Sequence, residues 1–213
     1  KGIEPVGAWI LEHCRREHLA PGKLGDQVYQ AADRGEVTQE EAPVLVRSFL
    51  SAGVDSTIDA IGNALNAFAL YPAQWNKVVA DPAKVKNAFE EVLRWDSPFQ
   101  AFFRTTTREV ELAGVRIAKH EKVMVSPGAA NRDPRHWQRP DLFDVERKTT
   151  GHVGFGHGIH TCIGQMIARL EIDALLTEMA KRKLSFQLTG MPKRRVNNTL
   201  HGFGYLPMRI TAA

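Results

Sequence analysis

The densest run of hydrophobic positions extends from about Pro43 to Leu70 and has the spacing of one long helix. Apolar side chains fall on nearly every face of that helix, which is typical of a helix buried in a protein core. Thr38 and Glu41 before it have the spacing of a capping box, and Tyr71-Pro72 ends it. The segment would measure on the order of 40 Å if wholly helical. Its apolar members are Val44, Leu45, Val46, Phe49, Leu50, Val54, Ile58, Ile61, Leu65 and Phe68.

Small and polar residues interrupt this apolar helix in the sequence AGVDST, where Gly53, Asp55 and Ser56 stand together. A buried polar group needs a hydrogen-bond partner or a chemical task. Two interpretations stay open from the residues alone. In the first, the side chains bond to their own backbone and bend the helix. In the second, Asp55 and Ser56 take part in chemistry.

The rest of the chain is mostly helical by pattern. The segment NAFEEVLRW reads as a helix that Asp81 opens as N-cap, with Pro82 at the first helical position. Short strands are predicted only in the second half of the chain. They lie at Val110–Leu112, Val115–Ile117, Val123–Val125 and in the tail after Leu184, with turns at Gly114 and Lys119–Glu121. The pattern predicts a mainly α fold with small antiparallel β-sheets.

One cysteine lies in a glycine-rich loop directly before an apolar helix, in the sequence FGHGIHTCIG from Phe155 to Gly164. Free N–H groups of a helix that starts near Ile163 and Gly164 would stabilise a thiolate on Cys162. Glycines in the loop allow a tight turn and a close approach to a flat ring. The residues therefore suit a thiolate ligand of haem iron.

Two simpler interpretations compete with haem ligation. Free cysteines are usually inert small hydrophobic residues, and Cys162 could be one of these. Zinc is the other, because three histidines crowd the same segment as Cys162, at positions 152, 157 and 160. Their spacing matches no common structural zinc pattern. The complete set of constrained positions in the loop favours haem.

The loop resembles the cysteine-ligand loop of the cytochrome P450 superfamily. The resemblance implies that Cys162 is the axial ligand of the iron of haem b, and that His160 holds a propionate at the ring edge. The family's cofactor-binding positions in the loop are filled by Phe155, Gly156, His160, Cys162 and Gly164, with Gly158 also matching.

Further matches follow the family's order along the chain. Glu91 and Arg94 match its ExxR pair, which is structural and holds a segment resembled here by Ala129–Lys148. Taken alone, this pair would be an ordinary surface pair on one helix face. Arg104 matches the arginine that binds a haem propionate in the family. The alternative interpretation of Arg104 is a solvated arginine at a strand edge.

The segment Ala52–Thr57 resembles the oxygen-activating groove of the family's long central helix, so Asp55 and Ser56 are the expected catalytic pair that handles protons. The family usually has threonine where this chain has Ser56. Serine keeps the hydroxyl but lacks the methyl group that restricts its rotamer, so we expect less ordered proton delivery.

The resemblance implies a monooxygenase that inserts one oxygen atom from O2 into its substrate. Electrons would come from NAD(P)H through a ferredoxin reductase and an iron-sulfur ferredoxin. Basic residues expected on the cysteine-side face would attract an acidic ferredoxin. These are Arg132, Arg135, Arg139 and Lys148, with the loop near His157.

Several segments are similar to bacterial cytochromes P450 that oxidise para-substituted benzoates by O-demethylation or hydroxylation. They are LVRSFLSAG, SPFQAFFRTTTREVELAG, GAANRDP, TGHVGFG and KRRVNNTLHG. This likeness implies a small aromatic acid as substrate, with Ser48, Ala52, Phe99 and Phe102 in the substrate pocket. Plain core packing is the alternative for the two phenylalanines.

Length and composition complete these expectations. The 213 residues match only the C-terminal half of the family's fold, so residues 1–213 are interpreted as the haem-binding C-terminal portion of a single domain whose N-terminal half is absent. Two cysteines fit a reducing cytoplasm. A net charge of +4 comes without a basic stripe interleaved with aromatic residues, which argues against nucleic-acid binding.

We expect no membrane span, because Arg47, Asp55 and Asp59 interrupt the longest apolar run, and we expect a monomer. Two other functions stay open. One is a truncated, non-catalytic haem-binding fragment. The other is a peroxide-using haem-thiolate enzyme, which would be expected to have an acid and an arginine over the haem in place of Asp55 with Ser56.

Overall fold

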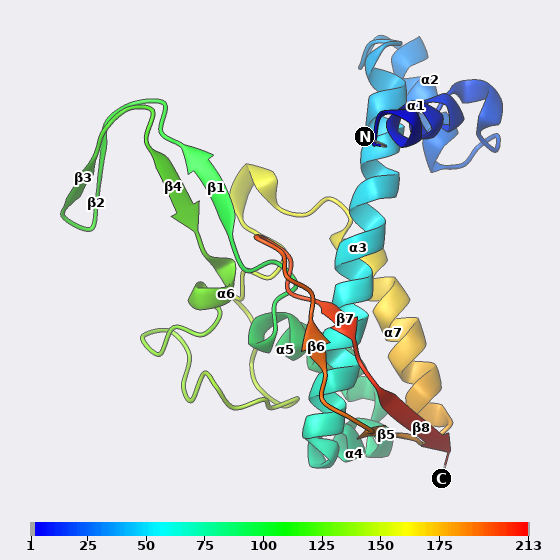
Figure 1. Ribbon diagram of the computed structural model, residues 1–213. Helices are drawn as coiled ribbons and strands as arrows, with labels where there is room; N and C mark the ends of the chain where they lie inside the picture. The colour runs from blue at the N-terminus through cyan, green and yellow to red at the C-terminus, as the bar shows by residue number, and fades with distance from the viewer. Residues whose placement is uncertain (1–2, 213) are drawn as a thin grey trace. The chain divides into compact units, whose positions relative to one another are not determined.

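The structure is a computed structural model that describes residues 3–212. The chain forms two compact units, Lys1–Asp55 and Ser56–Ala213. One long helix, α3 (Glu41–Leu70), begins in the first unit and ends in the second (Figure 1). The predicted helix over Pro43–Leu70 is therefore confirmed. It ends where Tyr71 and Pro72 were expected to end it, and α4 starts at Pro72.

The first unit contains α1 (Ile3–His13), a 3₁₀ turn at Arg16–His18, α2 (Leu24–Asp33) and the first part of α3. The capping box before α3 is present. The Glu41 N–H donates to Thr38 Oγ1 at 3.1 Å, and the Thr38 N–H donates to Glu41 Oε2 at 2.8 Å. The small core of this unit consists of Cys14, Tyr29, Ala32, Ala42 and Val46. Burial raises the pKa of the Cys14 thiol, so this cysteine is inert.

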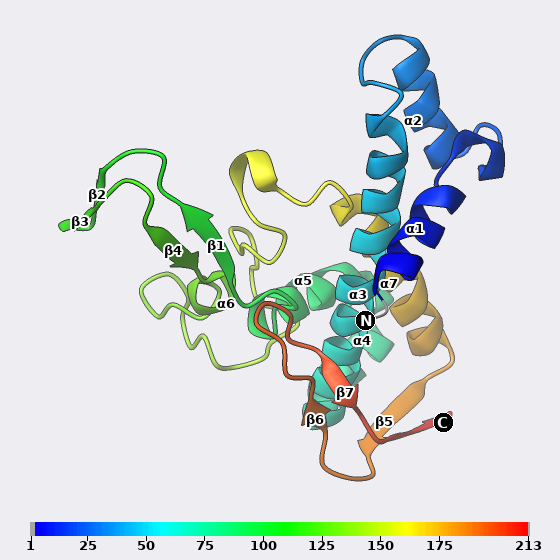
Figure 2. The same cartoon turned by 45° about the horizontal axis from the view of Figure 1, so that its top comes forward.

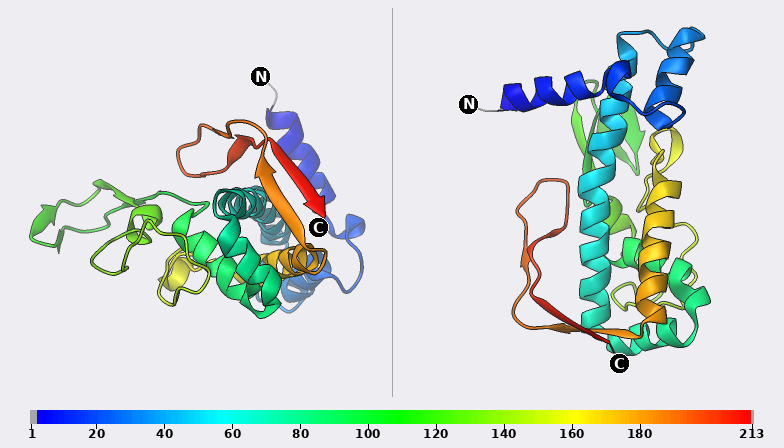
Figure 3. Two further views of the ribbon diagram at one scale, coloured as in Figure 1. Left: turned by 90° about the horizontal axis from the view of Figure 1, so that it is seen from below. Right: turned by 90° about the vertical axis from the view of Figure 1, so that its right-hand side faces the viewer.

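The second unit is built on helices that share one core. They are the end of α3, α4 (Pro72–Ala80), α5 (Val85–Trp95) and α7 (Gln165–Lys181), with α6 (Pro127–Ala130) and 3₁₀ turns at Pro82–Lys84 and Gly158–His160. The end of α3 and α7 lie side by side in Figures 1 and 3. Phe68, Val92 and Leu176 bring α3, α5 and α7 into this core. Asp81 acts as an N-cap by accepting the Ala83 N–H at 3.2 Å, but it caps the 3₁₀ turn at Pro82–Lys84, and α5 itself begins at Val85, later than expected.

Strands of the second unit form four antiparallel pairs. The pairs are β1 (Phe102–Thr105) with β4 (Lys122–Val125), β2 (Val110–Leu112) with β3 (Val115–Ile117), β5 (Leu184–Leu188) with β8 (Met208–Ala212), and β6 (Lys193–Arg194) with β7 (Phe203–Tyr205). The β2–β3 hairpin projects from the helices in Figure 2, and its turn uses positive φ angles at Ala113 and Gly114. The predicted fold class is confirmed, although β1 was not predicted as a strand.

The expectation that α3 is buried on all faces is wrong for the described residues. Leu50, Val54 and Ile58 are each more than half exposed. In the first unit, α3 packs only a narrow face, which contains Ala42 and Val46, onto its neighbours. An apolar pattern reports where burial would stabilise a helix and does not say which part of a chain covers it.

Candidate functional site

Cys162 is exposed at the end of a closed loop. Its N–H donates to the Phe155 carbonyl at 2.8 Å, which joins the two ends of the turn. Gly156 has a φ of 75°, and a Cβ there would lie 3.2 Å from the His160 carbonyl oxygen. The loop therefore requires glycine at that position. Helix α7 begins at Gln165 with Gly164 as N-cap, slightly later than the sequence predicted.

Phe155 connects this loop to the core of the second unit. Its half-buried ring packs edge-on against Phe89 with the ring centroids 6.5 Å apart, and the Arg169 guanidinium lies 4.5 Å from its centroid. Because the Phe155 carbonyl also accepts the Cys162 N–H, the core fixes the backbone that carries the thiol.

The residues around Cys162 expose a large apolar surface. Ile159 is 97% exposed and Ile163 is 81% exposed, and Met166 on the first turn of α7 is also exposed. Exposed apolar side chains gathered in one segment mark a surface that a ligand or partner covers. A thiol among glycines and bare apolar side chains suits a large, flat, apolar iron cofactor.

A zinc cluster in this segment is not formed by the described residues. His152 instead binds Glu90, with Nε2 lying 2.6 Å from Oε2, and its Nδ1 accepts the Gly154 N–H at 3.0 Å. Within residues 3–212, the only group of three or more His, Cys, Asp or Glu side chains whose ligand atoms lie close enough to share a metal is Glu12, Glu17 and His18. That group is in the first unit and not in the cysteine loop.

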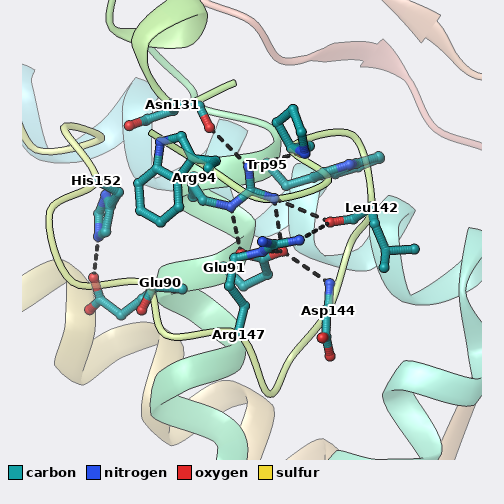
Figure 4. Close-up of polar contacts among 12 residues, drawn as sticks. Glu90, Glu91, Arg94, Trp95, Asn131, Leu142, Asp144, Arg147 and His152 are labelled. Carbon is teal, nitrogen blue, oxygen red and sulfur yellow. Dashed lines mark hydrogen bonds and ion pairs between the residues drawn. The ribbon is translucent and has the colours of Figure 1, made fainter. Parts of the chain in front are cut away.

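The Glu91–Arg94 pair is fully buried and is not an ordinary surface pair (Figure 4). Arg94 Nε donates to Glu91 Oε2 at 2.7 Å, and a terminal nitrogen donates to Oε1 at 2.9 Å. The remaining donors of Arg94 reach the carbonyl groups of Asn131, Pro140 and Leu142. All five N–H donors of the guanidinium are thus satisfied, which offsets the cost of burying its charge.

Glu91 extends this network into the segment 129–148. Its Oε1 also accepts the Asp144 N–H at 3.0 Å and Arg147 Nε at 3.1 Å. Arg147 in turn donates to the carbonyl groups of Gln138, Arg139 and Leu142. Within the described residues, no buried side-chain nitrogen or oxygen lacks a hydrogen-bond partner. The irregular segment is therefore held by side chains in place of a regular sheet.

The family model for cytochrome P450 matches residues 22–211 of this chain. The chain belongs to the cytochrome P450 family. It is 50% identical over 209 residues to cytochrome p450 CYP199A2 of Rhodopseudomonas palustris, which covers 98% of this chain and 51% of that protein. It is also 34% identical to 6-deoxyerythronolide B hydroxylase of Saccharopolyspora erythraea, over 95% of this chain and 52% of that protein.

Solved P450 structures also match nearly all of this chain, which covers about half of each of them. The crystal structure of CalO2 matches with a TM-score of 0.87 and 30% identity, covering 99% of this chain and 54% of CalO2. A P450 monooxygenase with bound tirandamycin C, TamI, matches with a TM-score of 0.86 and 27% identity, over 98% of this chain and 53% of that structure. The chain thus spans about half the length of the curated relatives it matches.

In this P450 chain, Asp55 and Ser56 lie within an unbroken helix. The helix α3 continues through residues 52–57, so the bend considered from the sequence does not interrupt it. Asp55 is exposed and belongs to the first unit, and half-buried Ser56 belongs to the second. Earlier on α3, Ser48 is exposed and donates to the Val44 carbonyl at 2.8 Å, and Ala52 is exposed as well.

The expected pocket and propionate residues of the second unit lie around β1. Phe99 and Phe102 stack with their ring centroids 4.9 Å apart, and both are half-buried, so they are not plain core residues. Arg104 is exposed on β1, and its side chain donates to the Phe103 carbonyl at 2.9 Å. His160 is exposed in the turn before Cys162.

Sequence reasoning missed a carboxylate that bridges the flanks of the cysteine loop. Glu90 binds both His152 and Arg169. It directly precedes Glu91 on α5 and looks like an ordinary helix residue in the sequence. The one signal in the sequence is the crowding of histidines near the loop, and it does not name Glu90 as the partner of His152.

Proposed function

We propose that the complete protein is a haem-thiolate monooxygenase and that residues 1–213 are the haem-binding C-terminal portion of its P450 domain. The observation that carries this proposal is the exposed Cys162 thiol, held by the Phe155 carbonyl on a glycine loop among bare apolar side chains. When bound, haem b supplies the reductive activation of O2 that allows one oxygen atom to enter the substrate.

The loop residues would hold the cofactor in complementary ways. Cys162 would supply the thiolate ligand, and Gly156 and Gly164 keep side chains away from the ring. A Cβ at Gly164 would lie 3.9 Å from the Cys162 sulfur, in van der Waals contact with the ligand atom itself. His160 and Arg104 are exposed donors suited to the two propionates, because charge-assisted hydrogen bonds to carboxylates are strong.

Asp55 and Ser56 would move protons. Asp55 offers an exposed carboxyl group, and the neighbouring Ser56 hydroxyl can both donate and accept a hydrogen bond. Asp55 would bring protons to this part of α3, and the Ser56 hydroxyl would pass them to the reacting oxygen. Since the Ser56 hydroxyl lacks a β-methyl group to fix its rotamer, some electrons would be lost as hydrogen peroxide.

A small aromatic acid is the substrate class that the residues favour. The stacked, half-buried rings of Phe99 and Phe102 offer a flat apolar surface to an aromatic ring. Ser48 and Ala52 on α3 match pocket positions of benzoate-oxidising P450s and offer small side chains to a substrate. Para-substituted benzoates, oxidised by hydroxylation or O-demethylation, fit this combination and the segments that resemble benzoate-oxidising P450s.

Electrons would come from NAD(P)H through a ferredoxin reductase and a ferredoxin. Two basic residues of the expected docking face are already paired, because Arg135 binds Asp133 and Arg132 binds Asp141. Arg139 and Lys148 are exposed and would contribute most to steering an acidic ferredoxin. No helix within residues 3–212 has the length and hydropathy needed to cross a bilayer. We further propose a cytoplasmic monomer.

Isotope incorporation tests the proposed activity. The complete protein, with a ferredoxin, its reductase and NADH, should hydroxylate a para-alkylbenzoate under ¹⁸O2 and place the label in the product. Ser56→Ala should keep substrate binding but form less product per NADH consumed, whereas Ser56→Thr should equal or improve the parent. Product oxygen that comes from water would contradict the proposed activity. A Ser56→Ala protein that forms as much product per NADH as the parent would contradict the proposed proton path.

A further inference from the structure

Two basic side chains on opposite flanks of the cysteine loop bind the same carboxylate, that of Glu90 on α5. Arg169 on α7 donates from Nε to Glu90 Oε1 at 2.5 Å and from a terminal nitrogen to Oε2 at 3.2 Å. His152, before the loop, places Nε2 2.6 Å from Oε2 (Figure 4). The Glu90 side chain is 20% exposed and that of His152 is 8% exposed, so their hydrogen bond is largely shielded from water.

The first arm runs through His152. Because its Nδ1 accepts the Gly154 N–H at 3.0 Å, the ring hydrogen lies on Nε2 and is donated to Glu90. The next N–H, of Val153, donates to the Asn131 side chain at 2.7 Å. At Gly154, a Cβ would lie 3.2 Å from the Leu93 carbonyl oxygen of α5. The chain that leads into Phe155 is thus pinned against α5.

The second arm runs through Arg169. Its guanidinium lies over the Phe155 ring, and a terminal nitrogen donates to Gln165 Oε1 at 2.7 Å at the start of α7. The Phe155 carbonyl accepts the Cys162 N–H at 2.8 Å. Both arms therefore converge on the residue that holds the backbone of Cys162.

The charge of Glu90 is stable at any ordinary pH. Burial works against the ionised form, but the hydrogen bonds from His152 and Arg169 outweigh it and hold the pKa of the carboxyl at about 2. Within the described residues, the Glu90 carboxylate makes no hydrogen bond to the side chain of Glu91 or Arg94. The two networks meet at Asn131, whose side chain accepts the Val153 N–H and whose carbonyl accepts a hydrogen bond from Arg94.

We propose that Glu90 is a positioning residue that fixes Phe155, and through the Phe155 carbonyl the backbone of Cys162, so that the thiolate keeps one position toward the haem iron. This inference rests on the proposed haem-thiolate function. It assigns Glu90 a role distinct from that of Glu91, which holds the segment 129–148.

Glu90→Gln in the haem-loaded complete protein tests this role. Glutamine keeps the shape but removes the charge that both arms need. Glu178→Gln is the matched control, because Glu178 is an exposed carboxylate that binds Lys181 at 2.8 Å. We expect Glu90→Gln to retain haem but to lose the reduced carbon monoxide band of thiolate ligation about tenfold faster than the control, since a charged hydrogen bond is lost. Amide hydrogen exchange at Cys162 should accelerate by a similar factor.

Variants of the arms keep the test sharp if Glu90→Gln fails to fold. Arg169→Lys and His152→Gln each remove one arm. Each variant alone should lose the thiolate band several-fold faster than the control, which is a smaller effect than that of Glu90→Gln. A parent without the thiolate band would overturn the proposed function and this inference with it. The other outcome is a parent that has the band, with Glu90 and arm variants that match Glu178→Gln in band lifetime and amide exchange. That result would overturn the role of Glu90 and leave the proposed function standing.

Discussion

The segment 129–148 and the stretch of α3 around Leu50–Ile58 differ in how far the described residues provide contacts for their side chains. The first is irregular and polar, yet Glu91, Arg94 and Arg147 bond to its backbone, and no buried side-chain nitrogen or oxygen of the described residues lacks a partner. The second is regular and apolar, yet Leu50, Val54 and Ile58 lie exposed. Regular secondary structure therefore does not show whether the side chains of a segment have their packing and hydrogen-bond partners. The described residues hold the cysteine loop by hydrogen bonds and ring contacts, whereas α3 carries apolar surface that they leave bare.

Removing Glu91 should cause the largest loss. Glu91→Ala leaves the buried guanidinium of Arg94 without its counter-charge, which costs about 3–5 kcal/mol. We expect a protein that neither folds stably nor incorporates haem, as measured by urea unfolding and haem content. The exposed Glu178→Ala should stay close to the parent. A stable, haem-loaded Glu91→Ala protein with slow turnover would show a chemical role in place of the structural one.

Acid should weaken the protein through Glu90 next. Its folded-state pKa of about 2 lies below the ordinary value of 4.5, so the stabilisation is complete above about pH 4.5 and is lost as the pH falls toward 2. The full effect is about 3 kcal/mol at most. Glu90→Gln should therefore be less stable than the parent at pH 6, and the difference in unfolding free energy should shrink with acid. A difference that is constant with pH would contradict this origin.

Gly202, in the hairpin loop between β6 and β7, provides a test of packing against α3. A Cβ at Gly202 would collide with Asp59 Oδ1, and buried Asp59 binds Arg195 at 3.1 Å. Gly202→Ala should therefore cost about 1–3 kcal/mol through displacement of the carboxylate. Gly7→Ala is the control, because a Cβ there meets nothing within 4 Å. Thermal unfolding that leaves the two variants equally stable would show that the hairpin yields easily.

Truncation of the bare face of α3 should have the smallest effect. Ile58→Ala removes an exposed side chain and should change the unfolding free energy of this 213-residue chain by no more than about 0.5 kcal/mol. Phe68→Ala on the same helix removes a fully buried ring and should cost about 3–5 kcal/mol. Equal losses in urea unfolding would erase the contrast between the two regions.

Local signals in the sequence predicted local structure well. The capping box at Thr38 and Glu41, the end of α3 at Leu70 and the β2–β3 hairpin all follow from residues within a few positions of one another. The spacing of Glu91 and Arg94 likewise predicted that they pair. It did not predict their burial, because three carbonyl groups from a distant segment make that burial possible.

Long-range partners were beyond the sequence. Glu90 meets His152 across 62 positions and Arg169 across 79, and no spacing rule connects them. The prediction that α3 is buried on all faces failed for a related reason, because an apolar pattern does not show which part of a chain covers it. The Cys162 loop was the exception, because its glycines, cysteine and following helix are contiguous, and the closed turn from Phe155 to Cys162 follows from them.

The reduced carbon monoxide difference spectrum of the complete protein, compared with Cys162→Ser, tests the central claim most directly. The parent should show the band diagnostic of thiolate ligation, and Cys162→Ser should lose it, because serine cannot supply a thiolate to the iron. Cys14→Ser is the control, because Cys14 is the other cysteine and is buried in the first unit. It should keep the band. Survival of the band in Cys162→Ser would contradict the assignment of Cys162 as the haem ligand.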